Sequence, residues 1–268
     1  MALNLQYGTD IENRSNHISF DSDAANYDRV RPRYCPELFE QIFRTASISS
    51  ISQILEIGAG TGQATEPFFE LGCSVTAVEL GEHLADFLKQ KDSDRRNFTV
   101  WQGDFLDFPE DRKYDLVFSA TAFHWVPREQ GFEKVKRLLK PGGTLALFWN
   151  HPIIGGDPDS VDNRTVQSVY EKFGRSKIGK IFDGSSCDAY ARALRDAAFA
   201  DVCCQLFTSE RVLTGKEYVL LMRSYSDHIV LPYAERLQLE QEMERAIRGI
   251  GDALKIRDVM DLYLAKNP

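Results

Sequence analysis

Three glycines that follow an apolar run constrain this chain most strongly. In LEIGAGTG (55–62), the apolar run ends and Gly58, Gly60 and Gly62 form a turn that we expect to lead into a helix. Glycine is favoured there because it adopts positive φ without strain and lets a ligand approach the backbone. Glu79 ends the next apolar run, and a carboxylate at that point can accept hydrogen bonds from ribose hydroxyls. Strand, glycine loop, helix, second strand and terminal acid in this order predict a nucleoside site.

Short apolar runs alternate with longer amphipathic stretches from residue 53 onward. This rhythm predicts a doubly wound α/β fold with a mostly parallel sheet, because helical crossovers connect parallel strands. The predicted strands are Ile54–Ile57, Ser74–Glu79, Phe98–Gln102, Asp115–Ser119 and Thr144–Trp149, with further β-like runs at Val202–Leu213 and Val259–Ala265. The predicted helices are Glu82–Lys91, Gln130–Leu139, Val161–Phe173, Cys187–Ala198, Lys216–Arg223 and Ala234–Ile247.

The 268 residues are interpreted as one domain with four parts. Residues 1–46 form an N-terminal arm or lid with a first helix, and residues 53–151 form the cofactor-binding core. Residues 152–200, which begin with a loop rich in proline and glycine, are interpreted as an insertion that caps the substrate. Residues 201–268 supply the strands and helices that complete the sheet.

Composition excludes several classes of protein. With 43% hydrophobic residues the chain can bury a core, and its net charge of -8 argues against a nucleic-acid or anionic-membrane partner. Five cysteines without a CxxC pair, and no dense cluster of ligand residues, predict neither disulfides nor a metal site. No apolar stretch approaches the roughly 20 residues of a membrane helix, and the first residues lack the features of a secretory signal. We therefore expect a cytoplasmic location.

The spacing of the glycines indicates which nucleoside is bound. The dinucleotide fingerprint is GxGxxG, whereas here the third glycine comes one residue earlier, and Glu56 stands two residues before Gly58. A carboxylate so close to the loop suits a cationic ligand better than a pyrophosphate. S-adenosylmethionine has a sulfonium and an ammonium group and no phosphate. At these residues the chain resembles the class I S-adenosylmethionine-dependent methyltransferases, whose first motif is an acidic residue followed by GxGxG.

The resemblance implies a fold and a set of cofactor-binding residues. The implied fold is a Rossmann-like, mostly parallel sheet of seven strands whose last strand is antiparallel. Glu79 would hold the ribose, Asp104 would contact the adenine amine, and Phe105 would flank the base. The segments LLKPGG and ANYDRVRPRY resemble the type 11 branch, which includes trans-aconitate and quinone-precursor methyltransferases. The full set of expected cofactor residues is Tyr27, Arg31, Glu56, Gly58, Ala59, Gly60, Gly62, Glu79, Leu80, Asp104, Phe105 and Ser119.

Methyl transfer from a sulfonium is an in-line displacement, so positioning dominates and a general base is optional. His124 in AFHW is the first candidate for that base, because it follows the fourth strand, although it could instead be part of the pocket wall. His151 is a weaker candidate, since His151-Pro152 could be a simple turn. Tyr27 and Arg31 could close over the cofactor carboxylate, hold an acidic substrate, or remain solvated.

The resulting functional prediction is an S-adenosylmethionine-dependent methyltransferase that acts on a small molecule and releases S-adenosylhomocysteine. One alternative is methylation of RNA, DNA or protein, although SATAFHW replaces the (D/N)PP(Y/F) motif of amino-methylating DNA enzymes. A second is a cofactor-binding protein without transferase activity, and a third is an NAD(P) dehydrogenase. No motif identifies the acceptor, the methylated element or the oligomeric state.

Overall fold

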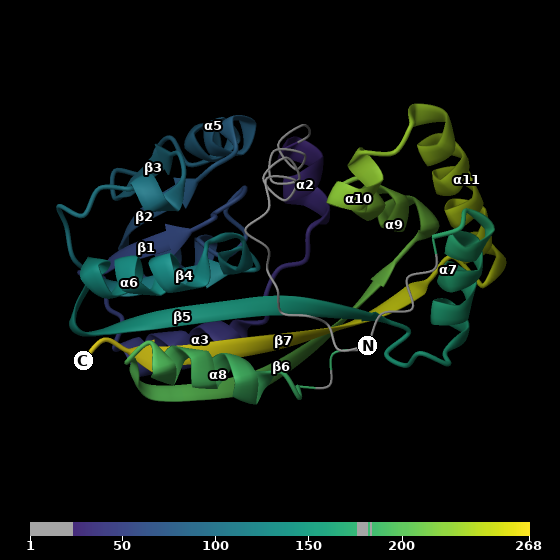
Figure 1. Cartoon of the computed structure of the whole chain (residues 1–268). Helices are drawn as coiled ribbons and strands as arrows, with labels where there is room; N and C mark the ends of the chain where they lie inside the picture. Colours follow the sequence, from purple (N-terminus) through teal and green to yellow (C-terminus); the bar gives the residue numbers. More distant parts are fainter. Residues whose placement is uncertain (1–23, 176–181, 183) are drawn as a thin grey trace.

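A single seven-stranded sheet organises the molecule, in the order β3-β2-β1-β4-β5-β7-β6 (Figure 1). The structure, a computed structural model, describes residues 24–175, 182 and 184–268. The pairings among β1 to β5 are parallel, whereas β7 runs antiparallel to both β5 and β6. The strands are β1 Gln53–Ile57, β2 Ser74–Glu79, β3 Phe98–Gln102, β4 Tyr114–Ala120, β5 Leu139–Ile154, β6 Ala200–Leu213 and β7 Leu254–Lys266. The predicted mostly parallel sheet with an antiparallel last strand is confirmed.

Helices cover both faces of this sheet, as the continuous apolar runs of the inner strands require. The α-helices are α2 Ala24–Val30, α3 Pro36–Ala46, α4 Glu66–Glu70, α5 Glu82–Lys91, α6 Arg128–Leu138, α7 Val161–Lys172, α8 Cys187–Asp196, α9 Gly215–Met222, α10 Ser226–Ile229 and α11 Tyr233–Gly249. Single 3-10 turns, η2 Phe105–Asp107 and η3 Phe123–Trp125, follow β3 and β4. One core packs Phe68 and Phe148 with α3, and the other packs Leu147 and Tyr263 with α6 and α8.

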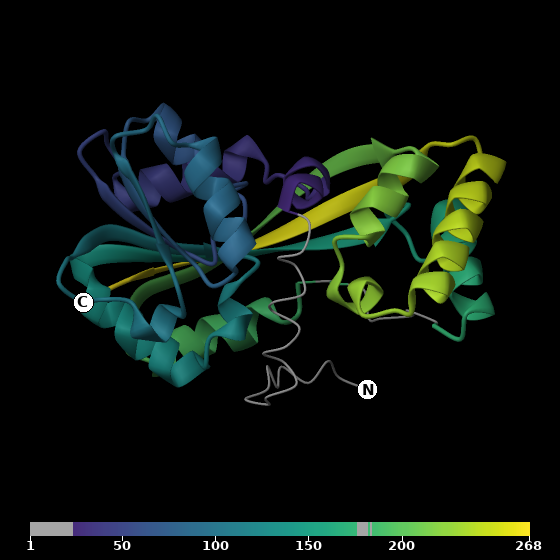
Figure 2. The same cartoon turned by 90° about the horizontal axis from the view of Figure 1, so that it is seen from above.

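The last three strands of the sheet are much longer than the others. The pairing of β4 with β5 ends at Ala120 and Phe148, whereas β5, β7 and β6 remain paired as far as Ile154, Ile256 and Arg211. Their projecting ends carry a third apolar core with α7, α9 and α11. We call α7, α9, α10 and α11 the helical lobe. Figures 1 and 2 show it on one side of the molecule, opposite the end that carries β3 and α5.

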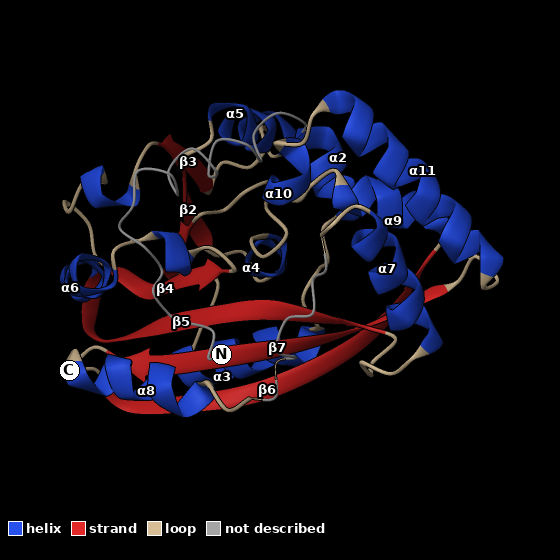
Figure 3. Cartoon of the chain, turned by 45° about the vertical axis from the view of Figure 1, so that its right-hand side comes forward, coloured by secondary structure: helices blue, strands red, loops and turns tan. Residues whose placement is uncertain are grey.

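The predicted insertion, residues 152–200, is distributed over two places. Its first residues extend β5, and α7 joins the helical lobe, where it packs against α11. By contrast, α8 packs on the sheet, where Tyr190 and Leu194 enter the core (Figure 3). Residues 176–181 and 183 lie outside the described part of the chain. The capping role of this segment stays a prediction.

The segment after the glycine loop differs from the expectation of an immediate helix. Turns follow Ala59, and α4 begins only at Glu66, with Pro67 in its first turn. Proline is tolerated there because the first N–H groups of a helix have no partner within the helix. Pro67 therefore lies at the start of α4 and does not kink this short helix. Among the described helices, none is long and apolar enough to cross a membrane.

Candidate active site

The glycine loop lies at the carboxyl ends of β1, β2 and β4. Gly58, Gly60 and Gly62 have φ of 71°, 58° and 89°, a region that side chains disfavour. The N–H groups of Gly58 and Ala59 donate to the carbonyl of Val78, at 2.8 and 3.2 Å. A Cβ at Gly58 would lie 2.4 Å from the Cβ of Ala122, in the loop after β4. Glycine is thus required at Gly58 by its backbone angle and by the close approach of a second loop.

Glu79 closes this loop onto the end of β2. Its Oε2 accepts from the N–H of Gly60 at 2.7 Å, and its Oε1 accepts from the N–H of Gly81 at 2.8 Å. The side chain is almost buried, with 7% of the residue exposed. A carboxylate offers about four acceptor sites, and two of them hold these backbone donors. The predicted ribose-binding residue therefore has a second task, which is to hold the glycine loop in shape.

Glu56 lies beneath the loop, with 1% of the residue exposed. Its Oε2 accepts a hydrogen bond from the hydroxyl of Thr65. Burial raises the pKa of this carboxyl to about 8, with a smaller contribution from the charge of Glu79 and against the hydrogen bond of Thr65. Glu56 is therefore mostly protonated at neutral pH, and a cation placed next to it would favour the ionised form.

The remaining residues predicted for the cofactor have unequal access to a ligand. Leu80 follows Glu79 and is 40% exposed, which is unusual for a leucine at the end of a buried strand. Asp104 is half-buried, and its Oδ1 accepts from the N–H of Leu106 at 2.9 Å, so it caps η2. Phe105 and Ser119 are buried: the ring of Phe105 packs in the core, and the hydroxyl of Ser119 donates to the carbonyl of Ile57 at 2.7 Å. The side chains of these two residues are structural.

The helix α2 lies across the site and joins its two sides. It contacts α5 next to the glycine loop and α9 in the helical lobe. Asp28 pairs with Lys91 of α5 at 2.8 Å, and Asn26 donates to the carbonyl of Leu220 in α9 at 3.0 Å. Tyr27 lies close to Gly60, because a Cβ at that glycine would be 3.6 Å from its Cε1. The N-terminal arm therefore covers the loop, although residues 1–23 lie outside the described part of the chain.

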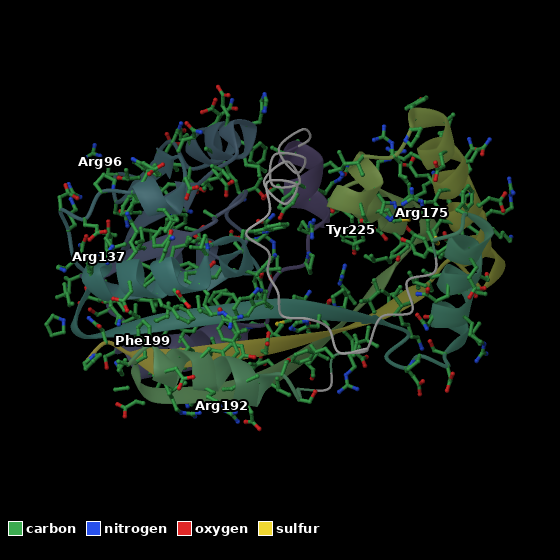
Figure 4. All side chains as sticks on the ribbon, in the orientation of Figure 1. Arg96, Arg137, Arg175, Arg192, Phe199 and Tyr225 are labelled. Carbon is green, nitrogen blue, oxygen red and sulfur yellow. The ribbon has the colours of Figure 1, made fainter. Side chains whose placement is uncertain are left out.

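Arg31 extends this cover to the helical lobe. Its Nη2 donates to the carbonyl of Ser224, and its guanidinium lies 4.7 Å from the ring centroid of Tyr27 and 5.2 Å from that of Tyr225. Tyr225 lies on the side of the helical lobe that faces α2 (Figure 4). The structure thus places Arg31 beside Tyr27 and adds Tyr225 as a third partner, while the role of the pair toward a ligand stays a prediction.

Sequence analysis missed a polar contact that links the N-terminal arm to β4 and β5. The hydroxyls of Tyr34 and Thr121 are 2.7 Å apart, and the N–H of Asn150 donates to the Thr121 hydroxyl at 3.3 Å. Thr121 has φ of 53°, a strained value for a β-branched residue, directly after the end of β4. Strain of this kind is concentrated at functional sites. Nothing in the local sequence signals the contact.

A family pattern of known proteins matches the part of the chain that runs from β1 into β5. The pattern of the family described as a methyltransferase domain matches residues 55–147, which contain the glycine loop, Glu79 and the loop after β4. An uncharacterized methyltransferase of Schizosaccharomyces pombe is 29% identical over 240 residues, 88% of this chain and 89% of that protein. An uncharacterized methyltransferase of Mycobacterium bovis is 32% identical over 166 residues, 57% of this chain and 65% of that protein.

Solved structures of methyltransferases share the fold of this chain. A protein described as a type II methyltransferase from Anaeromyxobacter dehalogenans matches with a TM-score of 0.62 and 18% identity, over 88% of this chain and 98% of that one. A methyltransferase from Thiobacillus denitrificans, solved with S-adenosyl-L-homocysteine, matches with a TM-score of 0.52 and 16% identity, over 93% of this chain and 97% of that one. The predicted Rossmann-like methyltransferase fold is confirmed.

His124, the first candidate for a general base, is held by a tryptophan. The indole Nε1 of Trp149 donates to Nδ1 of His124 at 3.0 Å. An indole N–H can only donate, so Nδ1 of His124 uses its lone pair, and the neutral ring carries its proton on Nε2. In this tautomer His124 presents a donor at Nε2, which does not suit a base.

His151 does not lie in a simple turn, which was one of the two predictions for it. It lies within β5, and its Nε2 is 2.9 Å from Oδ1 of Asp261 on β7. Asp261 also accepts from the hydroxyl of Tyr263 at 2.9 Å. Asp261 and Tyr263 were missed because they are more than a hundred residues away in the sequence and resemble ordinary strand residues. Within the described residues, no group of three or more His, Cys, Asp or Glu side chains could hold a metal ion.

Proposed function

We propose that this chain is an S-adenosylmethionine-dependent methyltransferase that acts on a small-molecule acceptor and releases S-adenosylhomocysteine. The observation that carries the proposal is the glycine loop closed on Glu79. Three glycines at positive φ bring bare backbone to the carboxyl ends of β1 and β2, and the carboxylate of Glu79 lies against them. An adenosyl group with a cationic side chain fits this arrangement, because it needs acceptors for its ribose and no site for a phosphate.

Different residues bind different parts of the cofactor. Glu79 accepts from the ribose hydroxyls, Leu80 offers its exposed apolar surface to the adenine, and Asp104 accepts from the adenine amine. Tyr27 and Arg31 lie over the loop, where a guanidinium suits the carboxylate of an amino acid. When bound, S-adenosylmethionine supplies a methyl group on a sulfonium, which is already activated for displacement. The chain then has to place a nucleophile in line and keep water out.

Two observations support a small acceptor over RNA, DNA or protein. First, α2 joins α5 to α9 and so covers the site that a macromolecule would have to enter. Second, a structural neighbour from Haemonchus contortus is a phosphoethanolamine N-methyltransferase, which matches with a TM-score of 0.53 and 15% identity over 92% of this chain and 57% of that one. A covered site next to the helical lobe suits a small ligand, because the protein can surround most of its surface.

Thermal unfolding with S-adenosylhomocysteine tests the cofactor. A ligand at 100 times its Kd adds about 2.7 kcal/mol of stability, which raises Tm by roughly 5 °C or more for a chain of this size. We expect this shift in the native protein and in Glu70→Gln, an exposed carboxylate at the end of α4, and not in Glu79→Gln. NADH should give no shift. A shift with NADH alone would support a dehydrogenase, and salt-sensitive RNA binding would favour a macromolecular acceptor.

A further inference from the structure

We propose that His151 is the general base of this methyltransferase, that Asp261 and Tyr263 position it, and that the acceptor carries a phenolic or enolic hydroxyl. The inference rests on the proposed function and names the acceptor class for the same site. It transfers the role of base from His124, in the turn η3 after β4, to a side chain on β5.

The pairing of β5 with β7 brings the three side chains together. His151 is opposite Val259, so Asp261, two residues further on β7, is its diagonal neighbour on the same face of the sheet. The next residue of β7 on that face is Tyr263, and its hydroxyl donates to Oδ2 of Asp261. The side chain of Asp261 is 5% exposed and that of His151 is 32% exposed. The acid is thus buried while the imidazole reaches an accessible surface.

This arrangement sets the tautomer of His151. An ionised carboxylate can only accept hydrogen bonds, so Nε2 of His151 carries the proton that Asp261 accepts, and Nδ1 keeps a lone pair. Within the described part of the chain, Nδ1 has no hydrogen-bond partner. The ring of Phe182 stacks on the imidazole, with centroids 3.8 Å apart and planes 1° from parallel. Orientation by an acid, an open nitrogen and a fixed ring plane are what a general base requires.

His124 and His151 share one tautomer, with the ring proton on Nε2, but different ring nitrogens are engaged in their bonds. Trp149 and His151 are two positions apart on β5, so they project from one face of the strand about 7 Å apart. Trp149 donates to Nδ1 of His124, so the lone pair of that ring is engaged, whereas Nε2 of His151 donates to Asp261 and the lone pair on Nδ1 remains. Of the two histidines, His151 is therefore the one that can remove a proton.

The proposed step balances with the proposed cofactor. As the acceptor oxygen forms its bond to the methyl carbon, its proton passes to Nδ1 of His151, and the electron pair of the broken carbon–sulfur bond leaves with sulfur. Asp261 stabilises the imidazolium that results. A carboxylate acceptor needs no base because it is already ionised at neutral pH, whereas a phenol, with a pKa near 10, gains from one. The flat rings of Phe182 and Trp149 favour a planar acceptor over an alkylamine.

Among the described residues, the other titratable groups that face the His151–Asp261 pair are Tyr263 on β7, Cys204 on β6 and Cys187 on α8. Burial raises the pKa of the Tyr263 hydroxyl and of the Cys204 thiol, so both stay protonated through pH 8. Neither adds a negative charge beside the imidazole, so Asp261 is the acid that positions His151.

Nitrogen NMR of the histidine rings tests the geometry without any turnover. In the full chain, with the ring of His151 neutral, we expect its spectrum to show a protonated Nε2 and a bare Nδ1. In Asp261→Asn, whose amide can donate as well as accept, this preference should be lost. In Tyr263→Phe the tautomer should remain. A protonated Nδ1 in the native protein, or an unchanged tautomer in Asp261→Asn, would overturn the proposal.

Kinetics with a panel of phenols, carboxylic acids and alkylamines tests the role. Glutamine can still donate to Asp261 but cannot act as a base, so His151→Gln should lower kcat for a phenol by about 100-fold or more, with KM changed less than threefold. The loss should shrink as pH rises and the phenol ionises by itself. His83→Gln, on exposed α5, is the matched control and should keep full kcat. Activity confined to acids or amines, or an unaffected His151→Gln, would overturn the assignment.

The two proposals fail separately. If S-adenosylhomocysteine does not stabilise the native protein, the proposed cofactor is wrong, whatever the spectrum of His151 shows. If it stabilises both the native protein and His151→Gln, and phenol methylation is equal in the two, the cofactor stands and the base is wrong.

Discussion

The two sides of the site are built from contacts of very different range. On the side of the glycine loop, the bonds that shape the site join residues close in the chain, such as Gly60 with Glu79, and Glu79 with Gly81. On the side of the helical lobe, they join strands far apart in the chain, as His151 with Asp261. The first side offers bare backbone and acceptors to a cofactor. The second offers buried ion pairs and oriented imidazoles, which depend on the whole sheet being formed.

The largest effect is expected from breaking a buried ion pair on the side of the helical lobe. Arg211 donates to both oxygens of Asp258, at 2.6 and 3.3 Å, and the carboxylate side chain is 2% exposed. Arg211→Met leaves that charge buried without its main partner and should cost about 3–5 kcal/mol of unfolding free energy. Urea denaturation measures it.

The control for this variant is a surface pair. Arg33 and Glu66 are both 52% exposed, so Arg33→Met should cost less than about 1 kcal/mol. At temperatures where Arg211→Met is folded, it should still bind S-adenosylhomocysteine. Equal costs for the two variants would show that the buried pair does not hold the helical lobe in place.

A smaller loss is expected from adding a methyl group to the glycine loop. Gly58→Ala meets Ala122 at 2.4 Å and forces alanine into positive φ, which together should cost about 2–4 kcal/mol and weaken cofactor binding. Gly142→Ala is the matched control, because Gly142 has φ of 72° and no atom near its missing Cβ. It should cost about 1 kcal/mol and leave binding intact. Similar binding in both variants would count against the close approach of the two loops.

The buried carboxyl of Glu56 should make stability depend on pH. The folded chain keeps this proton up to about pH 8, whereas the unfolded chain releases it near pH 4.5. Between these values the folded state binds more protons, so stability falls as pH rises, by at most about 1.4 kcal/mol per pH unit from this group. Glu56→Gln should flatten that part of the curve. The unfolding free energy of each protein is measured by urea denaturation at a series of pH values. If it changes with pH equally in the variant and in the native protein, the carboxyl is ionised in the folded state.

The smallest effect is expected where the two sides meet. Tyr34→Phe removes the 2.7 Å bond to Thr121, which keeps its contact with the N–H of Asn150, so we expect a cost of about 1 kcal/mol. Tyr233→Phe, at a residue that is 71% exposed, should cost nothing measurable. A stability change below about 0.5 kcal/mol in Tyr34→Phe would mean that the Tyr34–Thr121 contact contributes little to holding the two sides of the site together.

Strand limits show where sequence patterns are informative. Apolar runs predicted β1, β2 and β3 almost to the residue, because these strands are bounded by turn residues. For β5 they predicted Thr144–Trp149, whereas the strand covers Leu139–Ile154. The extension contains Pro152, which usually ends a strand. It is tolerated here because β4 has already ended, so this part of β5 has an open side.

The candidate site also contains features that the local sequence predicts and features that depend on tertiary contacts. The conformations of Gly58, Gly60 and Gly62 and the position of Glu79 follow from a strand–loop–strand unit whose partners lie within about two dozen residues. The burial of Phe105 and Ser119 could not be predicted, because it depends on which helix covers the end of each strand. The Nδ1 of His124 faces Trp149, a contact that needs the loop after β4 to lie against β5.

By itself, the sequence determined that this chain forms a mostly parallel sheet with a glycine loop and an acidic residue at one edge. Those features depend on the period of apolar residues and on the backbone freedom of glycine, both of which are local. Only the tertiary structure decided which histidine faces an acid. Asp261 reaches His151 because antiparallel pairing sets β5 and β7 in one register, and a shift of one residue would turn the two side chains to opposite faces.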